Sequence, residues 1–213
     1  MGDGDIIVGI TGASGALYGR AFVREMLAGG LTVHLIPTRH AALIWRSEIG
    51  PPPGAAGRGE GEDFAADWKR WLGGAGSGGA AGLVVYDDAD IGAAPASGSF
   101  RARAMVIVPC SMNTLAKVAN GISDTLLARA AAVALKERRP LVLVPRETPL
   151  GLADLRNMVA ATEAGAVVLP ASPGFYDHPR EIGDLVNFIV SKICDQIGLA
   201  SGAPIRYEGG GRP

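Results

Sequence analysis

A glycine-rich turn that follows a short apolar run near the N-terminus constrains the fold of this chain most. Residues 6–8 are β-branched and predict a buried parallel strand, and residues 16–27 predict a helix. The intervening residues 9–15 read Gly-Ile-Thr-Gly-Ala-Ser-Gly, and their glycines let the backbone approach a ligand closely. Because the start of a helix offers free N–H groups and the positive end of a dipole, the turn predicts a phosphate site. A tight turn that binds nothing is the alternative.

Strand-like and helix-like segments alternate along the rest of the chain. Strands are predicted at residues 32–36, 83–86, 105–108, 141–144 and 167–169, and helices at residues 111–119, 124–138, 152–164 and 182–197. This order predicts an α/β fold over residues 1–213, a single-domain, three-layer αβα Rossmann-like (flavodoxin-like) doubly wound parallel sheet. Ligands of such folds lie at the carboxyl ends of the strands.

One stretch departs from this alternation. Residues 50–82 hold 11 glycines in 33 positions around a helix-like piece at residues 63–72. This composition predicts a flexible insertion in which Trp68, Trp71 and Leu72 dock on the surface. Residues 201–213 predict a loose C-terminal tail.

Composition excludes several classes of function. A net charge of −1 gives no electrostatic reason to expect nucleic acid or an anionic membrane surface. The chain has no run of eighteen apolar residues, so we expect neither a membrane span nor a signal peptide. Cys110 and Cys194 are far apart in sequence, and the three histidines form no zinc signature. We therefore expect reduced thiols in the cytoplasm and no metal.

The residues after the second predicted strand bear on the choice of cofactor. An NAD-binding unit carries Asp or Glu there for the ribose hydroxyls, whereas this chain has Pro37, Thr38 and Arg39. Thr38 and Arg39 suit the 2′-phosphate of NADP, and the turn is also similar to that of the short-chain reductases. Those enzymes use a Tyr followed four residues later by Lys, and Tyr176 with Arg180 comes nearest to this pattern. An NADP-dependent reductase therefore stays open as an alternative.

Polar side chains follow each predicted strand, and parallel strands bring them to one edge of the sheet. They are expected to suit an anionic planar cofactor. The set consists of Gly12, Ala13, Ser14, Thr38, Ser111, Met112, Asn113, Thr114, Arg146, Glu147 and Tyr176.

Several of these residues have a simpler interpretation. Ser111 is a candidate N-cap, a role that is compatible with phosphate binding. Arg146 and Glu147 are candidates for a surface ion pair, although their place after a buried strand favours a site. Lys136, near the end of a predicted helix, is by itself typical of a solvated lysine.

Four blocks in a fixed order make the sequence resemble a known family. They are Thr-Gly-Ala-Ser-Gly at 11–15, Pro-Ala-Ser-Gly-Ser at 95–99, residues 130–149 with Leu-Lys-Glu-Arg-Arg-Pro-Leu and Arg-Glu-Thr-Pro, and Pro-Gly-Phe-Tyr at 173–176. The chain resembles the flavin prenyltransferases, small flavoproteins that supply prenylated FMN to reversible decarboxylases. The resemblance covers nearly the whole chain apart from the glycine-rich insertion and the tail.

The resemblance implies residue roles. FMN would be held by Gly12, Ala13, Ser14, Thr38, Ser111, Met112, Asn113, Thr114, Arg129 and Arg146. Dimethylallyl phosphate would be bound by Ser97, Gly98, Lys136, Arg146, Tyr176 and Lys192. Glu48, Lys136 and Glu147 would be catalytic, with Lys136 supplied by a neighbouring subunit. Lys192 stands where the family often has Arg, so the charge is kept and the bidentate geometry is lost.

The implied reaction joins the dimethylallyl group to N5 and C6 of reduced FMN and releases phosphate without a metal. The resemblance also implies a homo-oligomer, expected to be a dodecamer, and a UbiD-type decarboxylase as recipient of the product, in ubiquinone synthesis or aromatic acid breakdown. Two alternatives stay open. Residues 109–124 resemble a block of the related flavin-dependent cysteine decarboxylases, and a flavin carrier without turnover would bind the same cofactor.

Overall fold

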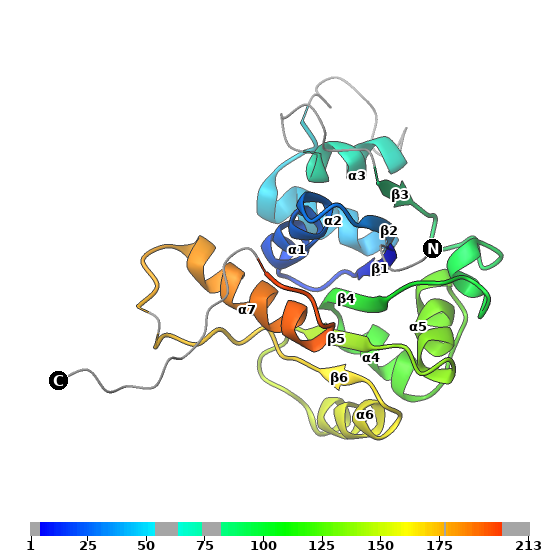
Figure 1. Cartoon of the computed structure of the whole chain (residues 1–213). Helices are drawn as coiled ribbons and strands as arrows, with labels where there is room; N and C mark the ends of the chain where they lie inside the picture. The colour runs from blue at the N-terminus through cyan, green and yellow to red at the C-terminus, as the bar shows by residue number, and fades with distance from the viewer. Residues whose placement is uncertain (1–4, 54–63, 74–81, 177, 202–213) are drawn as a thin grey trace.

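The computed structural model describes residues 5–53, 64–73, 82–176 and 178–201. These residues form a six-stranded parallel sheet in the order β3-β2-β1-β4-β5-β6 (Figure 1). The strands are β1 (Asp5–Ile10), β2 (Thr32–Pro37), β3 (Leu83–Val85), β4 (Ala104–Cys110), β5 (Leu141–Pro145) and β6 (Val167–Val168). The strand order reverses between β1 and β4, which makes their carboxyl ends the expected ligand crevice.

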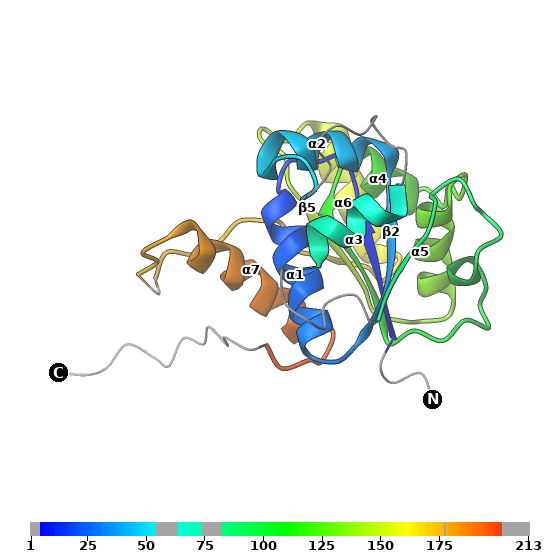
Figure 2. The ribbon, with the colours of Figure 1, turned by 90° about the horizontal axis from the view of Figure 1, so that it is seen from above.

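Helices cover both faces of the sheet, and the three layers are seen in Figures 1 and 2. The helices are α1 (Ala16–Ala28), α2 (Arg39–Ile49), α3 (Phe64–Leu72), α4 (Met112–Ala119), α5 (Leu126–Lys136), α6 (Leu152–Glu163) and α7 (Ile182–Gln196), with a 3-10 turn η1 (Ala94–Ala96). Side chains alternate along the strands: Ile6 and Val8 pack with α1, α3 and α7, whereas Ile7 packs with α4, α5 and α6. The predicted doubly wound α/β fold is confirmed.

The predicted strands and helices all occur, with ends that differ by one or a few residues. One helix was missed: α2, for which the sequence predicted no element. It follows β2 after Thr38, a residue type that is typical of an N-cap, but Thr38 forms no side-chain cap and the first turn has no acidic residue, so the signals of a helix start are weak. Only Ala41 and Trp45, one turn apart, are buried on it.

The prediction that the tryptophans dock on the surface is wrong. Trp68, Trp71 and Leu72 of α3 are buried in the main core, and the Trp68 ring centroid lies 4.6 Å from that of Trp45. The Trp71 indole N–H donates to the carbonyl of Gly50 at 3.0 Å. Large aromatic groups bury too much apolar area to stay at a surface when α2 offers a partner. Residues 54–63 and 74–81 of the predicted insertion, and residues 202–213 of the predicted tail, lie outside the described residues.

The described residues show neither a membrane-spanning helix nor a metal-binding cluster. None of their helices has the length and apolar character that a membrane crossing needs. No cluster of three or more His, Cys, Asp or Glu side chains suitable for a metal ion occurs among them.

Candidate active site

Three helices begin at the edge of the sheet where the strand order reverses. α1, α2 and α4 follow β1, β2 and β4, and a cavity of about 560 Å³ lies between the glycine-rich turn and the starts of α2, α4 and α5. We call it the switch-point cavity. Five of the ten residues predicted to bind the cofactor line it: Gly12, Thr38, Ser111, Asn113 and Thr114.

The N-terminus of α1 is already occupied by a side chain of the protein. Glu48, near the end of α2, accepts hydrogen bonds from the N–H groups of Gly15 at 2.9 Å and Ala16 at 2.8 Å. Burial would raise the pKa of Glu48, but hydrogen bonds from Ser14, Gly15 and Ala16 and the nearby Arg146 outweigh it and hold the pKa below its usual range. Glu48 is therefore an ionised carboxylate that caps α1, where the sequence predicted a bound phosphate.

The N-terminus of α2 lacks such a partner. Thr38 precedes α2, but its side chain does not cap the helix, and its buried Oγ1 has no hydrogen-bond partner within the described residues. Arg39 and His40 follow it and are exposed. A buried hydroxyl without a partner is costly, and two cationic or potentially cationic side chains at the positive end of a helix are unfavourable unless an anion binds there. This end of α2 therefore fits an anionic group.

The start of α4 forms a third wall of the switch-point cavity. Ser111 caps α4, since its Oγ accepts from the N–H of Thr114 at 3.3 Å. Ser111 therefore caps α4, as predicted, and also lines the cavity. Met112 packs against the apolar cluster below α4 and does not line the cavity.

Arg146 connects the glycine-rich turn with a second cavity. Its Nε donates to the carbonyl of Ser14 at 3.4 Å, and its side chain helps to line a hollow of about 330 Å³ with Glu147 and Pro149, which we call the Arg146 cavity. Glu147 accepts a hydrogen bond from the N–H of Thr148 at 3.1 Å. The guanidinium is directed at the turn, so the interpretation of Arg146 and Glu147 as a simple ion pair is not supported.

Lys136 lies at the opposite end of α5 from the switch-point cavity. Thr125 and Ala128, at the start of α5, line the cavity, whereas Lys136 is its last residue, about 15 Å away at the helical rise of 1.5 Å per residue. Lys136 is 61% exposed and pairs with Glu137 at 2.7 Å. Gly98 adjoins it, since a Cβ there would lie 3.1 Å from Nζ of Lys136. Within one chain, the structure brings Lys136 to Gly98 but not to the cavity.

Two further predicted substrate residues gather at α7. The ring of Tyr176 lies 5.7 Å from that of Phe188, and Nζ of Lys192 lies 5.9 Å from the same ring. Neither Tyr176 nor Lys192 lines the switch-point or Arg146 cavity. The N-terminal end of α7 and the segment before it extend away from the sheet (Figures 1 and 2).

The other predicted residues take varied positions. Ala13 is buried within the turn, and Ser14 contacts Arg146 and Glu48. Arg129 is exposed on α5 and lines none of the cavities described here. Ser97 bonds to Ser99 at 2.8 Å, close to the Gly98 contact with Lys136.

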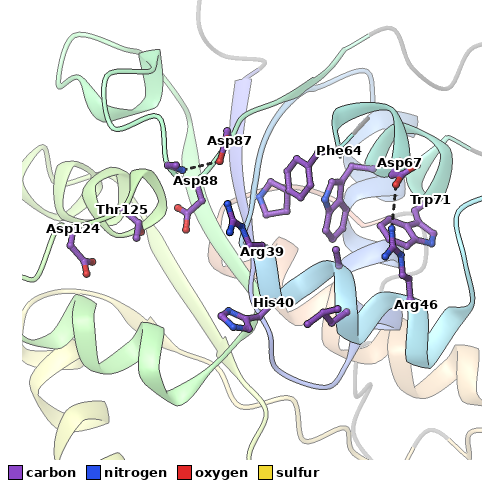
Figure 3. Close-up of a pocket in the computed structure, with 15 residues that line it drawn as sticks. Arg39, His40, Arg46, Phe64, Asp67, Trp71, Asp87, Asp88, Asp124 and Thr125 are labelled. Atoms are coloured by element: carbon purple, nitrogen blue, oxygen red, sulfur yellow. Dashed lines mark hydrogen bonds and ion pairs between the residues drawn. The ribbon is translucent and has the colours of Figure 1, made fainter. Parts of the chain in front are cut away.

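A wider groove of about 860 Å³ adjoins the switch-point cavity on the outer side of α2 (Figure 3). Arg39 and His40 line both hollows, with Asp88 and Thr125 on the other side. Burial raises the pKa of Asp88, although the N–H of Leu127 donates to its carboxylate at 2.8 Å. Residues of α3, including Phe64 and Trp71, form the apolar wall of the groove. His40 and Thr11 line the switch-point cavity without having been predicted. Thr11 directly follows β1, so the rule that residues after a strand line the site could have indicated it, whereas His40 lies on the unpredicted α2.

Comparisons with known proteins show the family of this chain. The protein-family model described as Flavoprotein matches residues 1–194. The flavin prenyltransferase UbiX of Synechocystis is 39% identical over 206 residues, which cover 96% of both chains. The chain belongs to the flavin prenyltransferase family. UbiX of Pseudomonas aeruginosa, another member, is 42% identical over 91% of this chain and 89% of its own.

Solved structures of the family superpose closely. AnUbiX (PadA1), crystallised in complex with FMN and dimethylallyl pyrophosphate, has a TM-score of 0.82 and 36% identity, covering 96% of this chain and 97% of its own. A dodecameric FMN-dependent UbiX-like decarboxylase from Escherichia coli O157:H7 has a TM-score of 0.79 and 35% identity, covering 96% and 99%. The cysteine decarboxylase TvaF, at 18% identity and a TM-score of 0.56, shares the fold alone.

Proposed function

We propose that this protein joins the dimethylallyl group of dimethylallyl phosphate to N5 and C6 of reduced FMN. The observation that carries the proposal is the match to a flavin prenyltransferase over 96% of both chains. The solved relative that contains FMN and a dimethylallyl compound supports both the cofactor and the class of donor. The cysteine decarboxylase alternative lacks comparable support, since the similarity of this chain to TvaF is limited to the fold.

The residues of the switch-point cavity fit FMN. Its volume of about 560 Å³ lies within the range of about 300–1,000 Å³ that is usual for cofactor pockets. We place the phosphate of FMN near Thr38 and the first turns of α2 and α4, because the N–H groups at the start of α1 are taken by Glu48. The unpaired Oγ1 of Thr38 would then gain an acceptor.

The remaining residues suit the transfer of an allylic group. Bound reduced FMN supplies the nucleophilic positions to which the prenyl group becomes attached. Cations must stabilise the departing phosphate, and Arg146 lies between the turn and its own cavity for that purpose. The family resemblance gives Glu48 a catalytic role, and its lowered pKa favours the ionised carboxylate over a proton donor. The exposed carboxylate of Glu147 is the candidate to accept a proton.

Three residues predicted to bind the substrate lie away from the cavities of their own chain, which supports an assembly of several copies. Lys136, Tyr176 and Lys192 lie outside both cavities of their own chain, so we propose that a neighbouring subunit supplies Lys136. The dodecameric relative supports a dodecamer here as well. We further propose a UbiD-type decarboxylase as recipient of the product, and a cytoplasmic location, which two free and buried cysteines support.

The proposed function is tested by a defined reaction. The protein is incubated without oxygen with reduced FMN and dimethylallyl phosphate, or with the diphosphate in a parallel sample, and the flavin is analysed by mass and absorbance. Prenylated FMN formed from the monophosphate supports the proposal. Bound but unchanged flavin with either donor would indicate a carrier, and tight NADPH binding without FMN uptake would indicate a reductase.

The Thr38→Val variant tests the placement of the phosphate. Because Oγ1 of Thr38 has no protein partner within the described residues, its removal should leave the stability of the FMN-free protein unchanged or slightly higher. The affinity for FMN should fall. Unchanged affinity would place the phosphate elsewhere.

A further inference from the structure

Thr11 makes two side-chain hydrogen bonds across the point where the strand order reverses. Its hydroxyl donates to the carbonyl of Pro109 at 2.8 Å and accepts from the N–H of Ser111 at 2.7 Å. The directions are fixed, since a carbonyl only accepts and an amide N–H only donates. Thr11 is 1% exposed, and its own N–H also donates to Pro109 at 3.2 Å. One buried hydroxyl thus joins the end of β1 to the end of β4.

The second of these bonds sets the start of α4. Ser111, held by Thr11, caps α4 through Thr114, and its hydroxyl also donates to Oγ1 of Thr114 at 3.1 Å. The next two N–H groups, of Met112 and Asn113, donate to no acceptor within the described part of the chain. They are the free donors of this helix start, and Asn113 lines the switch-point cavity.

We propose that Thr11 is a positioning residue for FMN binding. Its hydroxyl fixes Ser111 so that the free N–H groups at the start of α4 are directed at the phosphate end of the cofactor. The inference rests on the proposed function, since it assumes that the switch-point cavity binds FMN. Thr11 itself is held to the protein by both of its hydrogen bonds and acts through Ser111.

Two substitutions separate the hydroxyl from the shape of the side chain. Thr11→Val keeps the volume but leaves the N–H of Ser111 without its acceptor, whereas Thr11→Ser keeps the hydroxyl. We expect Thr11→Val to raise the Kd for FMN about tenfold, equivalent to 1.4 kcal/mol, and Thr11→Ser to stay within about twofold of the wild type. Kd is measured by flavin fluorescence, and thermal unfolding of the FMN-free proteins is recorded beside it. A Thr11→Val protein with a lowered Tm but an unchanged Kd would show a purely structural role and overturn the inference.

Hydrogen exchange of the wild-type protein gives a test that needs no variant to fold. The amide of Ser111 should be protected before FMN is added, because Thr11 already accepts from it. The amides of Met112 and Asn113 should become protected only after FMN is added. Fast exchange at Ser111 in the FMN-free protein, or no change at Met112 and Asn113, would overturn the inference. Failure of the wild-type protein to bind FMN at all would instead contradict the proposed function.

Discussion

Replacing Glu48 by Gln tests whether this carboxylate caps α1. The two N–H groups of Gly15 and Ala16 would keep one amide oxygen as acceptor, but the charge at the helix start would be lost. Hydrogen bonds to a charged group contribute about 1.5–3 kcal/mol and neutral ones about 0.5–1.5 kcal/mol. A charge near a helix start adds about 0.3–1 kcal/mol. Because Glu48 is exposed to solvent, we take the low end and expect a loss of about 1–2 kcal/mol.

Thermal unfolding of the FMN-free protein measures this loss. At this chain length a loss of about 1–2 kcal/mol lowers Tm by about 2–8 °C, provided that protein concentration is held constant in an oligomer. Glu147→Gln is the matched control, since Glu147 is a carboxylate on the same edge that accepts only from its neighbour Thr148 within the described residues. Its Tm should stay within about 1 °C of the wild type. Equal Tm values for Glu48→Gln and wild type, or an equal fall in both variants, would refute a stabilising contribution of the Glu48 charge to the start of α1.

The difference in stability between the wild type and Glu48→Gln should depend on pH in a defined direction. The pKa of Glu48 is lower in the folded protein than in the unfolded chain, where a Glu titrates near about 4.3. Its contribution to stability is therefore fully present above that value and is lost as the pH falls through the folded pKa. The difference in Tm between wild type and Glu48→Gln should be largest near neutral pH and should shrink below about pH 4. A difference that is the same at all pH values would show that the charge plays no part.

Three further predictions address other parts of the molecule. Ser14→Asp places a second carboxylate beside Glu48 on the turn, so the flavin content after gel filtration should fall; unchanged content would make the turn purely structural. Lys136→Ala should keep FMN uptake but reduce prenylated product at least about tenfold in a single turnover, which corresponds to a loss of ~1.4 kcal/mol of leaving-group stabilisation. The control Lys192→Arg keeps the cation and should stay active. An active Lys136→Ala protein would show that this lysine is only a solvated side chain. Trp68→Ala should lower the free energy of unfolding in urea by about 3–5 kcal/mol, because Trp68 is fully buried. The control Leu43→Ala, at a position 57% exposed, should change it by less than about 0.5 kcal/mol. Similar values for both variants would contradict the burial of α3 in the core.

The strands and most helices could be predicted because their signals are local. The apolar runs that form β1, β4 and β5 are buried on both faces, as parallel strands must be, and read as continuous hydrophobic segments. α2 could not be predicted in this way, since its burial depends on the contact of Trp45 with Trp68, which belongs to a helix inside the glycine-rich stretch. The local composition predicted that α3 lies at the surface, whereas its contact with α2 buries it in the core.

The chemistry of the site was predictable only in part for the same reason. Thr38 and Ser111 follow predicted strands, so strand order alone placed them together at the cavity. The capping of α1 by Glu48 spans 33 positions in the sequence and depends on how the unpredicted α2 packs. Lys136 was predicted to bind the substrate, but its distance from the cavity could not be predicted, because it depends on which end of α5 lines the cavity.

The capped start of α1 separates two places where an anion can bind. On one side lie the first turns of α2 and α4 with the unpaired hydroxyl of Thr38, and on the other lies Arg146 beside its own cavity. Glu48, whose pKa is lowered by its hydrogen bonds and by Arg146, caps the start of α1. An anion at the start of α1 would meet a fixed negative charge, so under the proposed function the phosphate of FMN binds at α2 and α4 while Arg146 stays available for the departing phosphate. A carboxylate that only shaped the turn would be replaceable by a neutral cap, whereas under the proposed function its charge also keeps the phosphate of FMN away from the start of α1.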